Sequence, residues 1–145
     1  MLRWLTNLKV AWYAIYYSAL YGVNRSVVFG LLRAEGWNPA RPTYEPNVPP
    51  IKEGWDYSWG PMQILPGTAE WMGYRGPPEA LHNPAIGMRY GTIYLRKQSR
   101  RYDGNVCKAL SAYNAGRCIQ GNEVYVTRAI PECAGYRCGN DGASS

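Results

Sequence analysis

Apolar residues recur at helical spacing along most of the chain, and this pattern predicts a mainly helical protein. The clearest stripe is formed by Val28, Leu31 and Leu32, which fall on one face of a helix expected over residues 25–35. Asn24 suits the N-cap of this helix, and Gly36 suits its C-terminal end. Comparable stripes and end signals predict further helices over residues 8–21, 66–72, 84–100, 106–115 and 123–130.

The first of these stretches resembles a signal peptide, because an apolar run over residues 10–21 follows Arg3 and Lys9. The run is too short to span a bilayer, which takes about 20 residues. No clear small-residue cleavage site follows it. Five residues also share one helical face, namely Leu8, Ala11, Trp12, Ile15 and Ala19. We therefore expect the first helix of the domain here, with no membrane span and no export by the general secretory route.

Residues 37–63 break the helical pattern with six prolines between positions 39 and 61. The same stretch contains large aromatic residues, too many for a disordered linker: Trp37, Tyr44, Trp55, Tyr57 and Trp59. We expect an irregular or weakly β insertion that contains a short hairpin and forms a groove. Trp37, Trp55 and Trp59 could stack on a sugar or simply pack the loop.

Composition is that of a globular protein, with 46% hydrophobic and 18% charged residues, and 145 residues suffice for one domain. The formal net charge of +6 favours an anionic partner, such as a wall polymer, a membrane surface or a nucleic acid. Thirteen Tyr and six Trp against a single Phe provide flat apolar faces with a polar group, which suit a surface that binds sugars or bases.

All four cysteines lie in the last third of the chain, which predicts two disulfides in an oxidising compartment. Three pairings are possible, and the simplest joins neighbours, Cys107 with Cys118 and Cys133 with Cys138. A zinc site is the alternative, although the spacing lacks the close cysteine pairs typical of zinc. We expect a domain over residues 1–130 and a Cys/Gly-rich tail over residues 131–145.

Glu35 continues the apolar stripe of its helix at the C-terminal end. Burial disfavours an ionised carboxyl group, and the negative end of the helix adds repulsion, so we expect a raised pKa for Glu35. A carboxyl group of this kind is typical of a general acid that works near neutral pH. The alternative is an ordinary glutamate at the edge of the stripe that reaches into water.

Three segments in order resemble the soluble lytic transglycosylase (SLT) domain of the lysozyme-like superfamily. They are Leu31-Leu32-Arg33-Ala34-Glu35-Gly36-Trp37-Asn38-Pro39, Ser58-Trp59-Gly60-Pro61-Met62-Gln63-Ile64-Leu65-Pro66-Gly67-Thr68-Ala69 and Ala112-Tyr113-Asn114-Ala115-Gly116. Tyr125-Val126 is a weaker match to the closing segment of the family. Gly36 stands where the family has Ser, and Pro61 stands where it has Leu. The resemblance implies a mainly α, α+β lysozyme-like fold.

The resemblance implies a peptidoglycan lytic transglycosylase, with Glu35 as the catalytic acid and then base. Such an enzyme cleaves the β-1,4 bond between N-acetylmuramic acid and N-acetylglucosamine and leaves a 1,6-anhydro end; this chemistry requires no metal or organic cofactor. Gln63 and Tyr113 are implied as substrate-binding residues. Met62, Ser58 and Asn114 are weaker candidates, since Met62 is also suited to packing under the groove and Asn114 to holding the helix end. No catalytic role is expected for His82.

Two other functions remain open. A hydrolytic enzyme similar to goose-type lysozymes would need a second carboxylate, for which Asp56 is the best placed. A virion structural or binding module would keep the fold without catalysis. No nucleic-acid partner is expected.

The expected partners are peptidoglycan glycan strands, together with phage tail or other virion proteins if a phage particle delivers the enzyme for local wall penetration. Action in the periplasm or cell wall follows from the substrate. Secretion is the alternative route.

Overall fold

The computed structural model describes residues 2–37, 51–53 and 56–139, and helices make up most of these ranges. In chain order, the elements are α1 (Leu2–Tyr21), α2 (Arg25–Ala34), β1 (Ile51–Glu53), β2 (Asp56–Ser58), α3 (Pro66–Trp71), η1 (Pro78–His82), α4 (Pro84–Arg101), α5 (Val106–Ala115), α6 (Glu123–Ala129) and η2 (Pro131–Cys133), where η denotes a 3-10 helix. The expected mainly α fold with a small β insertion is confirmed.

The ends of the central helices follow their capping residues closely. Asn24 Oδ1 accepts a hydrogen bond from the backbone N–H of Ser26 at the start of α2, at 2.8 Å. Asn83 Oδ1 accepts one from the backbone N–H of Ala85 at the start of α4, at 2.9 Å. Gly116 ends α5 in the left-handed conformation, with a φ of 86° that glycine adopts without a steric penalty. Local chemistry therefore sets these boundaries.

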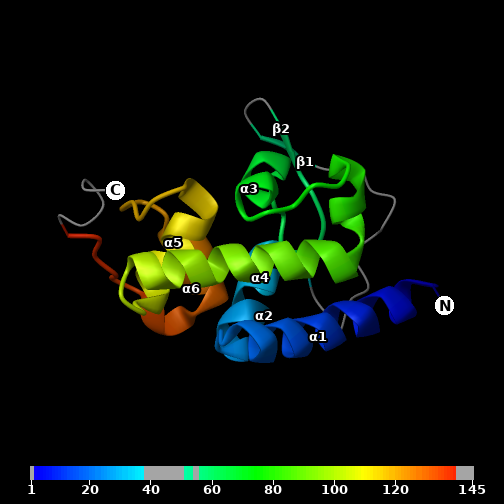
Figure 1. Cartoon of the computed structure of the whole chain (residues 1–145). Coiled ribbons are helices and arrows are strands. Elements are labelled where there is room, and N and C mark those ends of the chain that lie inside the picture. The colour runs from blue at the N-terminus through cyan, green and yellow to red at the C-terminus, as the bar shows by residue number, and fades with distance from the viewer. Residues whose placement is uncertain (1, 38–50, 54–55, 140–145) are drawn as a thin grey trace.

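Helix α4 is central in the molecule (Figure 1). It packs against α1 and α5, while α2 packs against α6. The core combines fully buried side chains from five parts of the chain: Leu31, Leu32, Met62, Leu81, Leu95 and Leu110. Helix α2 approaches α6 so closely that a Cβ on Gly30 would lie 2.4 Å from the main-chain oxygen of Ala129. This glycine therefore allows α6 to approach α2.

The two short strands form the hairpin expected in the insertion. They pair antiparallel, with Ile51 opposite Ser58 and Glu53 opposite Asp56. The chain then turns sharply, and Trp59 and Ile64 pair through their backbones, each N–H donating to the other carbonyl at 3.0 Å. The sequence also predicts that this insertion forms a groove. Most of the insertion, residues 38–50 and 54–55, lies outside the described residues.

Helix α1 begins at Leu2, earlier than the expected start near Leu8. The apolar stripe that contains Trp12 and Ile15 faces solvent, while the opposite side, with Val10 and Ala14 among its residues, is buried. Because α1 is largely apolar around its circumference, periodicity alone could not show which side faces the core. None of the helices in the described residues is both long enough and apolar enough to cross a membrane.

The two disulfides are confirmed, but the expected neighbour pairing is wrong. Cys107 pairs with Cys133, and Cys118 pairs with Cys138. Both bridges join the α5 region to the tail, and the side chains of Cys118, Cys133 and Cys138 are buried. All four thiols are consumed in disulfides, so the zinc alternative for the cysteines is also wrong. The tail is thus covalently attached to the helical body through residue 138.

Candidate active site

Glu35 lies at the C-cap of α2, directly after the last helical residue. Its backbone N–H donates to the carbonyl of Leu31 at 2.9 Å, and Gly36 then reverses the chain with a φ of 97°. The preceding residues of the stripe, Leu31 and Leu32, are fully buried, and Glu35 is half-buried. The structure thus places this carboxylate at the end of the apolar stripe, at the end of its helix.

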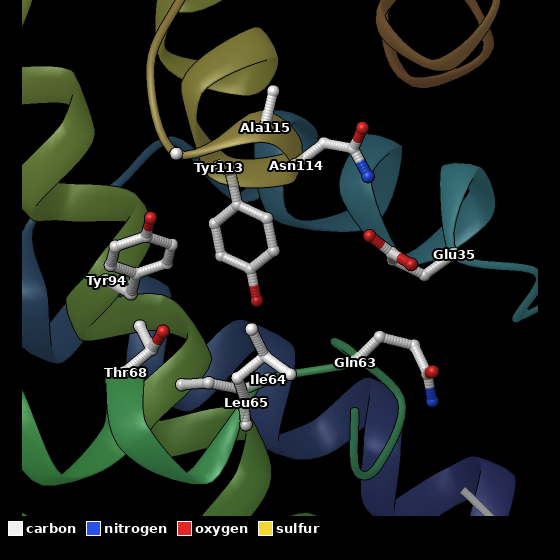
Figure 2. Close-up of a pocket in the computed structure, with 10 residues that line it drawn as sticks. Glu35, Gln63, Ile64, Leu65, Thr68, Tyr94, Tyr113, Asn114 and Ala115 are labelled. Atoms are coloured by element: carbon white, nitrogen blue, oxygen red, sulfur yellow. The ribbon is translucent and has the colours of Figure 1, made fainter. Parts of the chain in front are cut away.

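A pocket of about 250 Å³ opens beside Glu35 (Figure 2). It lies where α2, the segment leading into α3, α4 and α5 converge. Its lining consists of Glu35, Gln63, Ile64, Leu65, Thr68, Tyr94, Tyr113, Asn114, Ala115 and Gly116. The fold therefore brings together four residues that the sequence nominated from three separate segments: Glu35, Gln63, Tyr113 and Asn114.

Gln63 is held in an unusual backbone conformation, with a φ of 47°. It ends the tight turn from Gly60, to whose carbonyl both its backbone N–H (3.1 Å) and its side-chain Nε2 (2.8 Å) donate. Its Oε1 is buried and has no hydrogen-bond partner among the described residues. A strained backbone and an unused acceptor beside a pocket are typical of a functional position.

Tyr113 connects α5 to this turn. Its hydroxyl donates to the main-chain oxygen of Met62 at 2.7 Å, and its ring lies 5.1 Å from that of Tyr94. In Figure 2 the hydroxyl extends from α5 towards Ile64 and Leu65. Tyr113 therefore forms a wall of the pocket and fixes the turn that carries Gln63.

Tyr125 on α6 is a direct partner of the carboxylate. Its hydroxyl donates to Glu35 Oε1 at 2.7 Å in a half-buried setting. A phenol that donates to a carboxylate stabilises its ionised form and fixes its orientation. Sequence reasoning gave Tyr125 no role, although the weak match at Tyr125-Val126 was a signal that pointed to it.

The family model of the Transglycosylase SLT domain matches residues 13–129, which include the whole of this pocket. The chain belongs to the SLT family. Members of this family are lytic transglycosylases that act on peptidoglycan. No solved structure gave a significant match to the chain.

Two weaker candidates of this SLT domain are buried and do not line the pocket. Met62 is 1% exposed and packs against α4, where a Cβ on Gly91 would come within 2.6 Å of its Sδ. Ser58 is fully buried at the end of β2. Asn114 is exposed at the pocket and accepts a hydrogen bond from Asn122 Nδ2 at 3.1 Å, which ties the end of α5 to the start of α6.

The rival carboxylate, Asp56, begins β2 of the SLT domain opposite Glu53. Its side chain lies outside the described part of the structure.

The three tryptophans considered for sugar stacking differ in placement. Trp37 is 4% exposed, and its Nε1 donates to Asn7 Oδ1 at 3.0 Å, so this side chain packs the interior of the SLT domain. Trp59 is half-buried against the core, with the ring of His82 at its edge. Trp55 lies outside the described residues. Burial lowers the pKa of His82, and this residue is absent from the pocket lining.

Proposed function

We propose that this SLT domain is a peptidoglycan lytic transglycosylase in which Glu35 is the catalytic acid and base. The observation that carries the proposal is the Glu35 carboxylate at the edge of this pocket, with the Tyr125 hydroxyl bound to its Oε1. The pocket also contains a glutamine acceptor and a tyrosine wall, which suit an N-acetylated sugar.

In the proposed reaction, the Glu35 carboxyl group gives its proton to the oxygen that joins N-acetylmuramic acid to N-acetylglucosamine. The bond from this oxygen to C1 breaks, N-acetylglucosamine leaves as an alcohol, and the remaining ring becomes oxocarbenium-like. The Glu35 carboxylate then takes the proton from the C6 hydroxyl of the same ring, whose oxygen bonds to C1. The carboxyl group is regenerated, and no water is consumed.

Neighbouring residues have supporting roles in this proposal. Tyr125 stabilises the carboxylate that forms when Glu35 releases its proton. The free Oε1 of Gln63 accepts a hydrogen bond from the acetamido N–H of a bound sugar. Tyr113 holds the turn that carries Gln63 through its hydrogen bond to Met62. In the proposal, this fixed turn orients the bound sugar so that its C6 hydroxyl lies close to C1, and this proximity speeds the ring closure.

The test is digestion of purified sacculi by the wild type and by Glu35→Gln, with products identified by mass spectrometry. Loss of a general acid costs about 10²–10⁴-fold in rate, so Glu35→Gln should be at least about a hundredfold slower. Glu70→Gln, the same change on an exposed residue of α3, is the matched control and should keep full activity. A Glu35→Gln protein as active as wild type would refute the role.

The product ends separate the proposal from its rival. Anhydro ends, lighter by one water than reducing ends, support the transglycosylase. Reducing ends, together with loss of activity in Asp56→Asn, would instead establish a hydrolase with two carboxylates. Binding to sacculi without any cleavage would favour a catalytically silent virion module.

We also propose that a phage particle delivers this domain to the periplasmic wall, where it opens peptidoglycan locally. The two disulfides support action in an oxidising compartment. Mass spectrometry of purified particles should detect the chain among the tail proteins. Its absence there, with a processed form in the secreted fraction, would point to secretion instead.

A further inference from the structure

The side of α1 that faces away from the core is almost wholly apolar. We call it the outer face of α1 and define it by six side chains, each between 43% and 58% exposed: Leu5, Leu8, Trp12, Ile15, Tyr16 and Leu20. Lys9 is the charged residue among them. The buried side of the same helix already packs against α4 and α2, so nothing among the described residues covers the outer face.

This concentration differs from the rest of the described surface. Nine large hydrophobic side chains are exposed there, and six of them belong to the outer face of α1. The other three, Tyr57, Trp71 and Val124, come from separate elements. Single exposed apolar residues are common in proteins, whereas a continuous apolar strip along a helix indicates a binding surface.

The chemistry of the strip suits the boundary between water and lipid. Trp12 stacks on Tyr16 with ring centroids 5.1 Å apart, and the ring of Tyr13 meets Trp12 edge-on at 5.0 Å. Tryptophan and tyrosine are enriched at the headgroup level of membranes, because their rings are apolar and carry a polar group. Lys9 can place its aliphatic chain along the strip and its ammonium group among phosphates.

The charges around the strip are mainly positive. The first acidic residue of the chain is Glu35, so the preceding residues carry basic groups alone, among them Arg25 and Arg33. These two arginines and Ile15 of the outer face line a common hollow. Glu132 is the acidic residue in the lining of this hollow.

Two further arginines, on α4, lie against Tyr21 on the core-facing side at the end of α1. Arg89 Nε donates to the Tyr21 hydroxyl at 2.9 Å, and the Arg96 guanidinium lies 5.3 Å from the centre of the Tyr21 ring. The cations that border the apolar strip itself are therefore Lys9 within it and Arg25 and Arg33 of α2 beside Ile15, a set that suits anionic lipid headgroups.

We infer that the outer face of α1 docks the protein on an anionic membrane surface, with α1 lying in the plane of the headgroups. A second copy of this chain is a poorer occupant of this face. A two-fold contact would place Lys9 and the nearby arginines of one copy close to the same residues of the other copy, and these like charges repel. Insertion across the bilayer does not fit either, since none of the described helices can span it.

Docking by this face agrees with the position of the pocket. Figure 1 shows α1 along one edge of the molecule, with the hairpin and α3 at the opposite edge and α4 between them. Thr68 of α3 and Tyr94 of α4 line the pocket. A protein that rests on lipid through α1 would thus present the edge with α3 to the wall.

The test is flotation of the full chain with vesicles of phosphatidylglycerol and phosphatidylethanolamine, compared with phosphatidylcholine vesicles. We expect binding to the anionic vesicles that falls with added salt and is at least about tenfold weaker on the neutral ones. Changing Trp12 and Leu20 together to Gln should weaken binding about tenfold or more. The matched control changes Trp71 and Val124 to Gln, which removes one Trp and one aliphatic residue elsewhere and should leave binding intact.

Three results would overturn the inference: no binding to anionic vesicles, equal binding to both kinds of vesicle, or equal loss in the test and control variants. A dimer in sedimentation velocity that the Trp12 and Leu20 changes abolish would assign the face to a second copy instead. Circular dichroism verifies that each variant keeps its fold. Vesicle binding is measured without glycan, so its failure would leave the proposed enzymatic function untouched.

Discussion

Replacing Tyr125 with Phe removes one hydroxyl and with it the hydrogen bond to Glu35 Oε1. The ring that packs α6 against the core remains, so the change isolates the contact with the carboxylate. In the proposed reaction, Glu35 is neutral before proton transfer and ionised after it. The hydroxyl therefore binds more strongly at the transition state than in the ground state, which is the condition for a catalytic effect.

The expected loss of rate in Tyr125→Phe follows from the neutral and ionised states of the acceptor, Glu35. A hydrogen bond to an ionised group contributes about 1.5–3 kcal/mol, and one between neutral groups about 0.5–1.5 kcal/mol. The difference of about 1–1.5 kcal/mol corresponds to a roughly five- to tenfold slower reaction in Tyr125→Phe. The alkaline limb of the pH–rate profile should also move to higher pH, because the ionised form of Glu35 loses a stabilising donor.

The assay is the initial rate of muropeptide release from purified sacculi across a pH series. Tyr74→Phe is the matched control, since the Tyr74 hydroxyl donates to the carbonyl of Pro77 at 2.6 Å and Tyr74 is not among the pocket residues. It should cost about 0.5–1.5 kcal/mol of stability and leave the pH–rate profile unchanged. A Tyr125→Phe protein with the rate and profile of wild type would refute the reasoning. A slower protein with an unshifted profile and a reduced melting temperature would show a purely structural role.

Three further predictions concern stability. Gly30→Ala should lower the free energy of unfolding by about 1–3 kcal/mol in urea titration, because its Cβ would meet the Ala129 oxygen 2.4 Å away. Replacing Cys118 and Cys138 together with Ser should cost about 2–4 kcal/mol, seen as a lower melting temperature, since this bridge links residues 20 apart. Burial lowers the pKa of His82 from 6.5, so the unfolded chain binds the proton more readily, and stability should be full above that value and decline as pH falls below it.

A contradicting result can be stated for each of these predictions, and Gly30→Ala also has a matched control. Gly67→Ala, in a helix with open space around the added Cβ, should be neutral or stabilise by about 0.5–1 kcal/mol. An equal loss at Gly30 and Gly67 would contradict the packing explanation. An unchanged melting temperature in the variant without Cys118 and Cys138 would contradict a stabilising role for this disulfide. His82→Gln should flatten the decline below the ordinary histidine pKa of 6.5, and an unaltered decline would assign it to other groups.

Much of the fold was predictable because its helix ends are chemically local. Asn24, Asn83 and Gly116 act on backbone groups within a few residues, so their meaning is visible in the sequence. The pairing of the cysteines was not predictable, because it depends on where η2 and the end of the tail lie relative to α5. Proximity in the chain favoured the wrong pairs.

The residues of the candidate site also divide into those that a continuous segment of sequence reveals and those that only packing brings together. Glu35 could be nominated from its own helix, and Gln63 and Tyr113 from motifs, because each belongs to a continuous segment. Tyr125 could not be nominated with a role, since its contact with Glu35 joins residues 90 apart in the chain. That contact depends on the close approach of α2 and α6 at Gly30, which is a packing event rather than a pattern.

By itself, the sequence determined the helical class, most helix boundaries apart from the start of α1, and the carboxylate at the end of α2, because periodicity and capping act over one or two turns. The tertiary structure decided which side of α1 faces water, which cysteines pair and which hydroxyl meets Glu35. The physical reason is that an apolar helix offers several sides for burial, and distant residues meet only when whole elements pack.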